Sequence, residues 1–209
     1  IPTAFLVDAT GTVAMVGHPM FLEDVLPRVL AGTWDPAKDG ARGVKAEEAI
    51  TGKLDELMER GDLKGVVARV EEIEKDFPGV GAQLEDVKAR SLLLDGQCDS
   101  AYVILAKMTD RAIAEQNAPT LNSIAWNIVD PDSKVAKRDL DLALRAAEKA
   151  VEFSRSADAS IIDTLARVHF DRGDRARAIE LQKQAVEKAP AAKKDQFRDT
   201  LAEYEDAKK

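Results

Sequence analysis

The chain has very little cysteine and few aromatic residues. Cys98 is the only cysteine in 209 residues, so the chain can form neither an internal disulfide nor a Cys-x-x-Cys redox pair. Aromatic residues make up 5% of the sequence, against 45% hydrophobic residues in total. This composition favours helices packed through small side chains over a β-sandwich filled with aromatic rings. We therefore expect a mainly helical protein.

Positive charge and long apolar runs are also scarce. The net charge is −8, which argues against nucleic-acid binding because that binding needs clustered lysine and arginine. No run approaches the ~20 apolar residues of a membrane-spanning helix. The opening residues, IPTAFLVD, lack both a methionine and the basic segment of a signal peptide. We expect a fragment or a processed chain without a membrane span.

Nothing in the sequence predicts a metal, a cofactor or a catalytic residue. The two histidines, His18 and His169, lie far apart, and no His, Cys and carboxylate spacing resembles a metal site. The run Gly79-Val80-Gly81 lacks the third glycine and the preceding strand of a phosphate-binding loop. Cys98 precedes an expected helix, where we expect it to be a small packing residue.

The first 35 residues have a β-rich pattern that the rest of the chain lacks. Two apolar runs, residues 3–7 and 12–16, flank the turn formed by residues 8–11, which predicts an antiparallel hairpin. An apolar stripe over residues 20–31 predicts a helix that ends near Gly32 and is distorted by Pro27. Residues 36–44 are rich in Gly, Pro and Asp and are expected to form a linker. Helical periodicity begins at residue 45.

A repeat appears in the spacing of residues 45–209. Gly61 precedes Pro78 by 17 residues, Gly173 precedes Pro190 by 17, and Gly96 follows Gly61 at a distance of 35. Periods of this size are typical of helix-pair repeats. We place pairs at about 45–78, 82–115, 118–155 and 158–190, followed by a capping helix at about 192–206. Residues 130–138 are an insertion, expected to form a protruding loop.

The last pair resembles a tetratricopeptide repeat. Leu165-Ala166 supply the large–small step, Gly173 the turn, Ala178 and Ala185 the close packing, and Pro190 the stop. The resemblance implies a superhelix whose first helices line a concave groove that binds a protein or peptide. Trp126 would be the anchor of that ligand, and the alternative is that Trp126 packs between helices. The groove residues expected from the alignment are Asp86, Arg90, Asn122, Trp126, Asp163 and Arg167.

The amino-terminal segment resembles the rear half of a thioredoxin-like domain of the TlpA-like, or redoxin, group. Ile1, Pro2 and Thr3 match the triplet that opens a strand there, and residues 8–11 match the hairpin turn. The resemblance implies that Ile1, Pro2 and Thr3 form a substrate-contact loop. It also implies that catalysis belongs to a Cys-x-x-Cys pair in a front half that this sequence does not include.

These observations predict a β-hairpin and helix (residues 1–35), a linker (36–44) and a tetratricopeptide-like helical domain (45–209). The predicted function is that of the C-terminal portion of a thiol–disulfide oxidoreductase, inactive by itself, whose repeats bind a protein partner. The alternative is a non-catalytic interaction scaffold. A two-stranded hairpin needs a neighbour, which would be the helical stack, the front half or a second chain in a homodimer. The family resemblance favours a periplasmic location.

Overall fold

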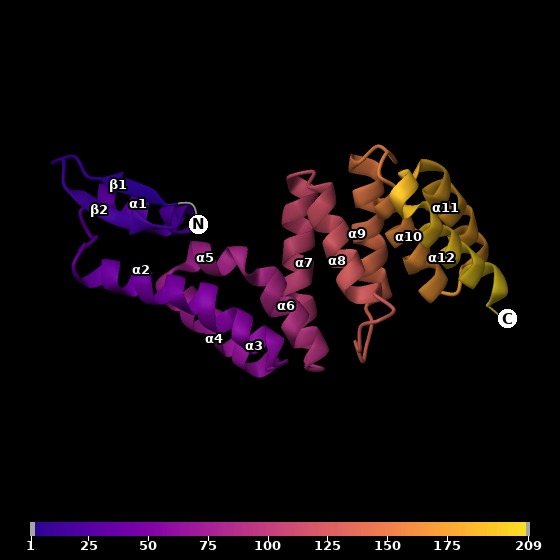
Figure 1. Cartoon of the computed structure of the whole chain (residues 1–209), viewed down its shortest axis with the longest axis horizontal. Helices are drawn as coiled ribbons and strands as arrows, with labels where there is room; N and C mark the ends of the chain where they lie inside the picture. The colour runs from indigo at the N-terminus through magenta and orange to yellow at the C-terminus, as the bar shows by residue number, and fades with distance from the viewer. Residues whose placement is uncertain (1–2, 208–209) are drawn as a thin grey trace. The chain divides into compact units, whose positions relative to one another are not determined.

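The computed structural model describes residues 3–207 and divides the chain into two compact units, residues 1–95 and 96–209. Within the described residues the protein is mainly helical, with a single two-stranded antiparallel sheet. The expectation of a mainly α protein that begins with a hairpin is therefore confirmed (Figure 1).

The hairpin consists of β1 (Ala4–Val7) and β2 (Val13–Gly17). Phe5 is paired with Val16 and Val7 with Val13, with an irregularity in register between Leu6 and Val7. The turn is closed by the Asp8 carboxylate, whose Oδ1 accepts hydrogen bonds from the backbone N–H groups of Thr10 and Thr12, both at 2.9 Å. Gly11 adopts a φ of 85°, a conformation that favours glycine.

A short 3₁₀ turn, η1 (Pro19–Phe21), leads into α1 (Leu22–Leu30). Pro27 lies inside this helix, where it has no N–H to donate to the carbonyl four residues earlier. The predicted apolar stripe is only partly buried. Val25 is fully enclosed, whereas Leu26 and Leu30 are exposed, and the aromatic core residues Phe21 and Trp34 flank the helix instead.

The expected linker is largely helical, which corrects the prediction for residues 36–44. Helix α2 runs over Lys38–Glu48 and continues through the π-helical turn η2 (Ala49–Leu54) into α3 (Asp55–Glu59). Asp35 explains the early start, since its Oδ1 accepts from the N–H groups of Ala37 and Lys38 at 2.9 and 3.2 Å. Asp39 in the first turn pairs with Arg28 of α1 at 3.0 Å.

Unit 1 is completed by α4 (Leu63–Asp76), α5 (Pro78–Gln83) and α6 (Glu85–Leu94). The short helix α5 lies between the expected first and second pairs and was not predicted. The hairpin, α1 and the helices share one hydrophobic core, in which Val25, Val66, Val70 and Phe77 are at most 1% exposed. The hairpin thus packs against the helical part of unit 1.

All regular secondary structure in the described residues of unit 2 is helical. It contains α7 (Cys98–Ala114), α8 (Ala118–Val129), α9 (Leu140–Phe153), α10 (Ala159–Asp171), α11 (Arg175–Lys188), the turn η3 (Ala191–Lys193) and α12 (Lys194–Asp206). Four of these helices begin at an Asx N-cap whose side-chain oxygen accepts a backbone N–H: Asn117, Asp139, Asp158 and Asp174.

Consecutive helices of unit 2 lie side by side (Figure 1): α8 packs on α9, α9 on α10, α10 on α11, and α11 on α12. The packing uses small side chains at the crossings, as the sequence predicted. Five alanines at these positions are 0% exposed: Ala101, Ala143, Ala150, Ala178 and Ala185. Alanine lets the backbones of neighbouring helices approach closely without leaving voids.

Candidate partner-binding site

The six predicted groove residues lie on three helices. Asp86 and Arg90 are on α6 of unit 1. Asn122 and Trp126 are on α8, and Asp163 and Arg167 are on α10. Because α8 and α10 pack against each other within unit 2, the structure brings these last four residues onto neighbouring helices. Asp86 and Arg90 belong to the other compact unit.

Trp126 is partly accessible to solvent. Its side chain is 36% exposed, whereas the neighbouring α8 residues Ile124, Ala125 and Ile128 are 0% exposed. The indole therefore lies at the margin of the helix packing rather than inside it. One turn earlier, Asn122 is half-buried, and its Oδ1 has no hydrogen-bond partner among the described residues. This oxygen is enclosed by the protein, and an unsatisfied buried acceptor costs free energy.

Asp163 is engaged inside unit 2. Its Oδ1 accepts a hydrogen bond from Nε2 of Gln182 at 2.7 Å, and the same amide donates to the Phe197 carbonyl at 3.2 Å. Burial raises the pKa of Asp163 above its ordinary value of 3.8, and the Gln182 hydrogen bond opposes that shift. Asp163 thus joins α10 to α11, and Gln182 of α11 makes the contact with α12.

Arg167 is also held by neighbours. Its side chain is 12% exposed, with Nε 2.9 Å from Oδ1 of Asp171 and Nη1 3.4 Å from Oε1 of Glu203. The guanidinium carbon lies 5.4 Å from the centre of the Phe170 ring. Phe170 in turn stacks on Tyr204 of α12. These contacts fasten the last helix to α10.

A buried acidic residue that the sequence did not single out organises this region. The Asp171 side chain is 8% exposed and lies between two arginines, with Arg138 Nη1 at 2.5 Å from Oδ2 and Arg167 Nε at 2.9 Å from Oδ1. Arg138 also donates to the Asp130 carbonyl at 2.7 Å. The two ends of the inserted loop are thereby tied to each other and to α10. Arg138 belongs to no helical or repeat pattern in the sequence. Its pairing with Asp171 can therefore be recognised only in the structure.

Tyr102 of α7 holds the same loop. Its hydroxyl donates to the Lys137 carbonyl at 2.6 Å and accepts from the Asp139 N–H at 2.9 Å. Burial raises the pKa of Tyr102 above 10.0. A groove of about 830 Å³ runs along these residues, and its basic groups are paired with acids of the same surface, Lys137 with Asp99 and Arg172 with Asp141.

The other residues that the sequence analysis considered for chemistry lie apart in the chain or outside the described residues. Ile1 and Pro2 of the predicted substrate-contact loop lie outside the described residues, and Thr3 is exposed. Cys98 is buried at the start of α7. His18 accepts from the Met20 N–H through Nδ1 at 3.2 Å, and His169 lies 3.5 Å from Asp174. Over residues 3–207 no group of three or more His, Cys, Asp or Glu could hold a metal ion.

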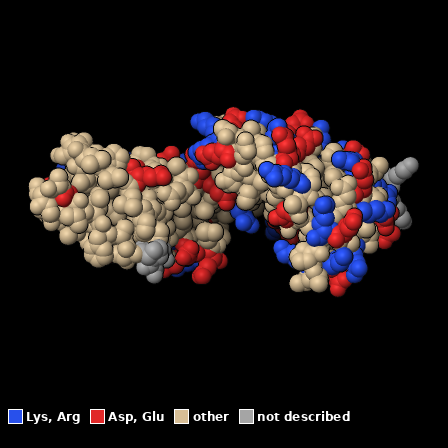
Figure 2. Space-filling view, turned by 90° about the horizontal axis from the view of Figure 1, so that it is seen from above, with Lys and Arg blue, Asp and Glu red and all other residues tan. Residues whose placement is uncertain are grey.

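The structure also leaves one face of the hairpin open. The cross-strand pairs Phe5–Val16 and Val7–Val13 are between 49% and 69% exposed, whereas Ala14 and Met15 are buried beneath them. Figure 2 shows few charged side chains over this part of unit 1, in contrast to the interspersed acids and bases of unit 2. Exposed apolar sheet faces of this kind are usually covered by another element.

None of the helices in the described part of the chain is long and apolar enough to cross a membrane. In comparisons with protein-family models, curated proteins and solved structures, nothing matched the chain.

Proposed function

We propose that this chain is the C-terminal portion of a thioredoxin-like thiol–disulfide oxidoreductase, and that its helical pairs bind a protein partner. The chain by itself is inactive in this proposal, because dithiol exchange requires an attacking thiolate and a second thiol to resolve the mixed disulfide. Cys98 is the single thiol in the sequence and is buried.

The open hairpin face is the observation that carries the redox part of the proposal. Strands β1 and β2 form a sheet of only two strands, with α1 following them in the chain. Phe5, Val7, Val13 and Val16 remain exposed on one face. A further segment of a thioredoxin-like fold would cover these four side chains and extend the sheet. That segment is also where the resemblance puts the Cys-x-x-Cys pair.

Repeat spacing and packing support a tetratricopeptide-like stack. Helices α4 and α7 begin at Leu63 and Cys98, and α9 and α11 at Leu140 and Arg175, an interval of 35 residues in both cases. Gly61, Gly96 and Gly173 have φ values of 67°, 80° and 85°, which place a left-handed turn before α4, α7 and α11. Within unit 2, α8 and α10 have the first-helix positions and pack against each other.

Partner binding is supported by Trp126. A tryptophan that is 36% exposed on α8 offers apolar area to a partner. Asp163 and Arg167 of α10 would form part of the same surface. Their contacts within unit 2 would hold them in place there.

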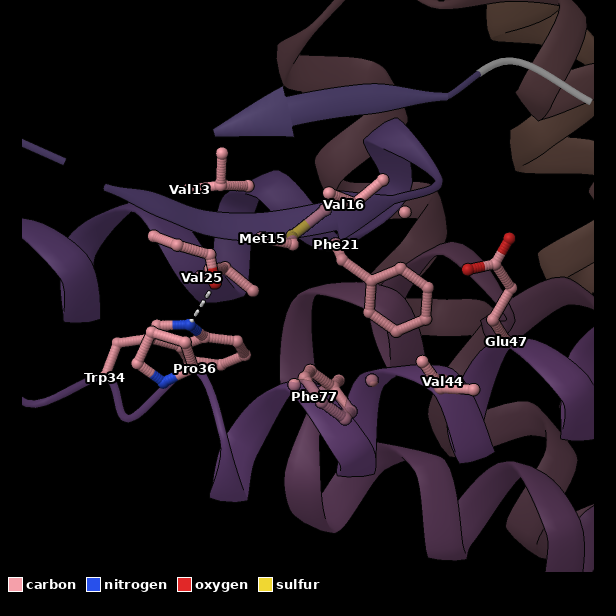
Figure 3. Close-up of a pocket in the computed structure, with 14 residues that line it drawn as sticks. Val13, Met15, Val16, Phe21, Val25, Trp34, Pro36, Val44, Glu47 and Phe77 are labelled. Atoms are coloured by element: carbon pink, nitrogen blue, oxygen red, sulfur yellow. Dashed lines mark hydrogen bonds between the residues drawn. The ribbon is translucent and has the colours of Figure 1, made fainter. Parts of the chain in front are cut away.

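A non-catalytic scaffold is the second candidate. It is favoured by the hydrogen bonds that connect the hairpin segment to the rest of unit 1. The Trp34 Nε1–H donates to the Ala14 carbonyl of β2 at 2.8 Å (Figure 3), and the Gly79 N–H of α5 donates to the Asp24 carboxylate of α1. In that case the hairpin serves to complete the core of the repeats and has no redox role.

The two candidates differ in the coding sequence before Ile1 and in one assay. We expect a Cys-x-x-Cys some 60–90 residues upstream, the usual size of such a half domain. We also expect no acceleration of insulin disulfide reduction by dithiothreitol with the 209-residue chain, but clear acceleration after the upstream segment is restored. Failure of the extended chain would favour the scaffold. Acceleration by the 209-residue chain that is lost in Cys98→Ser would contradict the assignment of Cys98.

Partner binding is tested separately with Trp126→Ala. The matched control is Val103→Ala, which removes an apolar side chain that is 58% exposed on α7. Partner proteins are first captured with the immobilised parent chain. We expect the Trp126→Ala variant to lose this capture and the Val103→Ala variant to retain it. Both variants should keep the circular dichroism spectrum of the parent. Equal capture by both variants would exclude Trp126 as the anchor.

A further inference from the structure

The sequence contains two Asp–Pro peptide bonds, Asp35–Pro36 and Asp130–Pro131. Such a bond is more labile than other peptide bonds. The aspartate carboxylate lies on the same residue as the carbonyl carbon of the bond, so its attack on that carbon is intramolecular. The proline nitrogen carries no hydrogen and leaves as a secondary amine once it is protonated. Surroundings that stabilise this attack at one of the two bonds would make it a self-cleavage site.

The carbonyl oxygen of Asp130 accepts three hydrogen bonds. The donors are Nη2 of Arg138 at 2.7 Å, the Ser133 hydroxyl at 2.7 Å and the Ser133 backbone N–H at 3.1 Å. A peptide carbonyl has two lone pairs, so this oxygen is fully engaged, and one of its donors is positively charged. Donors aimed at an oxygen that becomes negative during a reaction stabilise the transition state. The arrangement therefore favours a tetrahedral adduct at the Asp130 carbonyl carbon.

The Arg138 guanidinium is held in place by a second contact. Its Nη1 lies 2.5 Å from Oδ2 of Asp171, and the two side chains are 24% and 8% exposed. Because the pair is largely buried, salt screens its charge less than that of a surface pair. A donor whose position is fixed in advance needs no reorganisation when the oxygen becomes charged.

The attacking group belongs to the same residue as the carbonyl. Asp130 is the C-cap of α8, with φ −50° and ψ 117°, so its backbone has left the helical conformation. Oδ1 of Asp130 accepts from the Asp132 N–H at 2.9 Å, which keeps the carboxylate beside the turn. The other carboxylate oxygen can reach the carbonyl carbon by rotation about side-chain bonds alone.

The Asp35–Pro36 bond provides a comparison within the same chain. Its carbonyl oxygen accepts from the Asp39 N–H at 2.7 Å, and Oδ1 of Asp35 accepts from two N–H groups at the start of α2. In the described part of the chain, no arginine or hydroxyl group donates to this carbonyl. The two bonds thus have the same chemistry and different surroundings.

We propose that the chain cleaves its own Asp130–Pro131 bond. A carboxylate oxygen of Asp130 attacks the main-chain carbonyl carbon of the same residue, while Arg138 and Ser133 hold the oxygen that becomes negative. The carbon–nitrogen bond then breaks, the proline nitrogen takes a proton from the solvent, and a cyclic anhydride remains on Asp130. Water opens the anhydride to two carboxyl groups, so the sum is hydrolysis of one peptide bond. The inference concerns unit 2 only and does not depend on the redox proposal.

The two products, residues 1–130 and 131–209, would stay together after cleavage. Helix α8 ends before the cut and α9 begins after it, and these two helices pack against each other. Cleavage would open the inserted loop at its first residue and leave the helical packing in place. The products therefore have to be separated with denaturant before they are measured.

The test is incubation of the full chain at pH 6 and 37 °C, with denaturation and intact-mass spectrometry at each time point. We expect residues 1–130 and 131–209 to accumulate with a first-order rate constant that is independent of protein concentration. In the folded chain, cleavage at Asp130–Pro131 should be about tenfold or more faster than at Asp35–Pro36, and in urea the two rates should be similar. Similar rates in the folded chain, or a rate constant that rises with protein concentration, would overturn the proposal.

Two variants test the donors. Ser133→Ala and Arg138→Lys should each slow cleavage in the loop by about tenfold or more and leave the rate at Asp35–Pro36 unchanged. Arg172→Lys is the matched control, because Arg172 pairs with an acid of the same surface and not with the Asp130 carbonyl. Parental rates in both donor variants would contradict the role of the donors. If Arg138→Lys does not fold, Ser133→Ala decides.

Hydroxylamine tests the intermediate. It opens an anhydride to a hydroxamate, so cleavage in its presence should leave a hydroxamate on Asp130 of the first product. A contaminating protease would produce a free carboxyl group there instead. Cleavage without any hydroxamate would therefore exclude attack by the Asp130 carboxylate.

Discussion

The Asp24 carboxylate of α1 accepts a hydrogen bond from the backbone N–H of Gly79 at 2.7 Å, although the two residues are 55 positions apart. Its other oxygen accepts from the Val80 N–H at 3.0 Å. Gly79 and Val80 lie in the first turn of α5, where N–H groups have no partner within the helix. Asp24 therefore caps a helix from a distance and joins the hairpin segment to the helical part of unit 1.

Removing this cap should lower the stability of unit 1. Asp24→Ala leaves two N–H groups of α5 without an acceptor, so we expect a loss of about 1–2 kcal/mol in the free energy of unfolding, as for other N-caps. The measurement is urea denaturation followed by circular dichroism. Glu23→Ala, at the exposed preceding position, is the control and should change stability little. Equal effects of the two substitutions would show that the cap contributes nothing.

Enlarging a small residue at a helix crossing should also destabilise the fold. Ala178 of α11 is 0% exposed, and Ala178→Leu would force extra volume between packed helices at a cost of about 1–3 kcal/mol. Ala176→Leu, on the exposed side of the same helix, should be neutral. Thermal melts of the two variants compare the positions directly, and an unchanged midpoint for Ala178→Leu would contradict the packing.

Asp171 should be much more important for stability than a comparable surface acid. Asp171→Asn would leave Arg138 and Arg167 without their shared buried carboxylate, and we expect a loss of about 2–3 kcal/mol. The inserted loop should then be cut faster by trypsin after Lys134 and Lys137.

The control for this variant is Asp141→Asn, because Asp141 also pairs with an arginine but its side chain is 90% exposed. We expect it to cost less than about 1 kcal/mol and to leave the trypsin cleavage rate unchanged. Similar losses for the two variants would mean that burial of the Asp171 pair has no special effect.

Asp163 should make the free energy of unfolding decrease as the pH rises toward neutral. Burial raises the folded-state pKa of Asp163 above 3.8. Below its unfolded-state pKa, such a carboxyl is protonated and makes its full contribution to the stability of the folded state. This contribution is lost as the pH rises through the folded-state pKa. Asp163→Asn stays neutral and can still accept from Gln182. We therefore expect the variant to be more stable than the parent at pH 7.

The measurement is the difference in urea midpoint between Asp163→Asn and the parent from pH 3.5 to pH 7. That difference should be near zero at the lowest pH and increase toward neutral pH. Asp199→Asn, on an exposed part of α12, should show no such trend. A variant less stable than the parent at pH 7 would mean that the charged carboxylate is favoured in place.

Much of the architecture could be predicted from local pattern. The turn at Gly11, the N-caps such as Asp174, and the burial of Ala178 and Ala185 all depend on neighbouring residues in the chain and on helical periodicity. The region after Trp34 was misread as a linker because Gly and Pro signal irregular structure on average. There the Asp35 cap and the Arg28–Asp39 ion pair favour a helix.

The sequence by itself determined a mainly helical chain that begins with a hairpin, a single cysteine and a 35-residue interval between helices, because composition and periodicity are properties of short segments. Only the tertiary structure decided that Asp24 caps α5 and that Asp171 lies between Arg138 and Arg167. Those arrangements join residues far apart in the chain, and their stability comes from burial and geometry that no local pattern encodes.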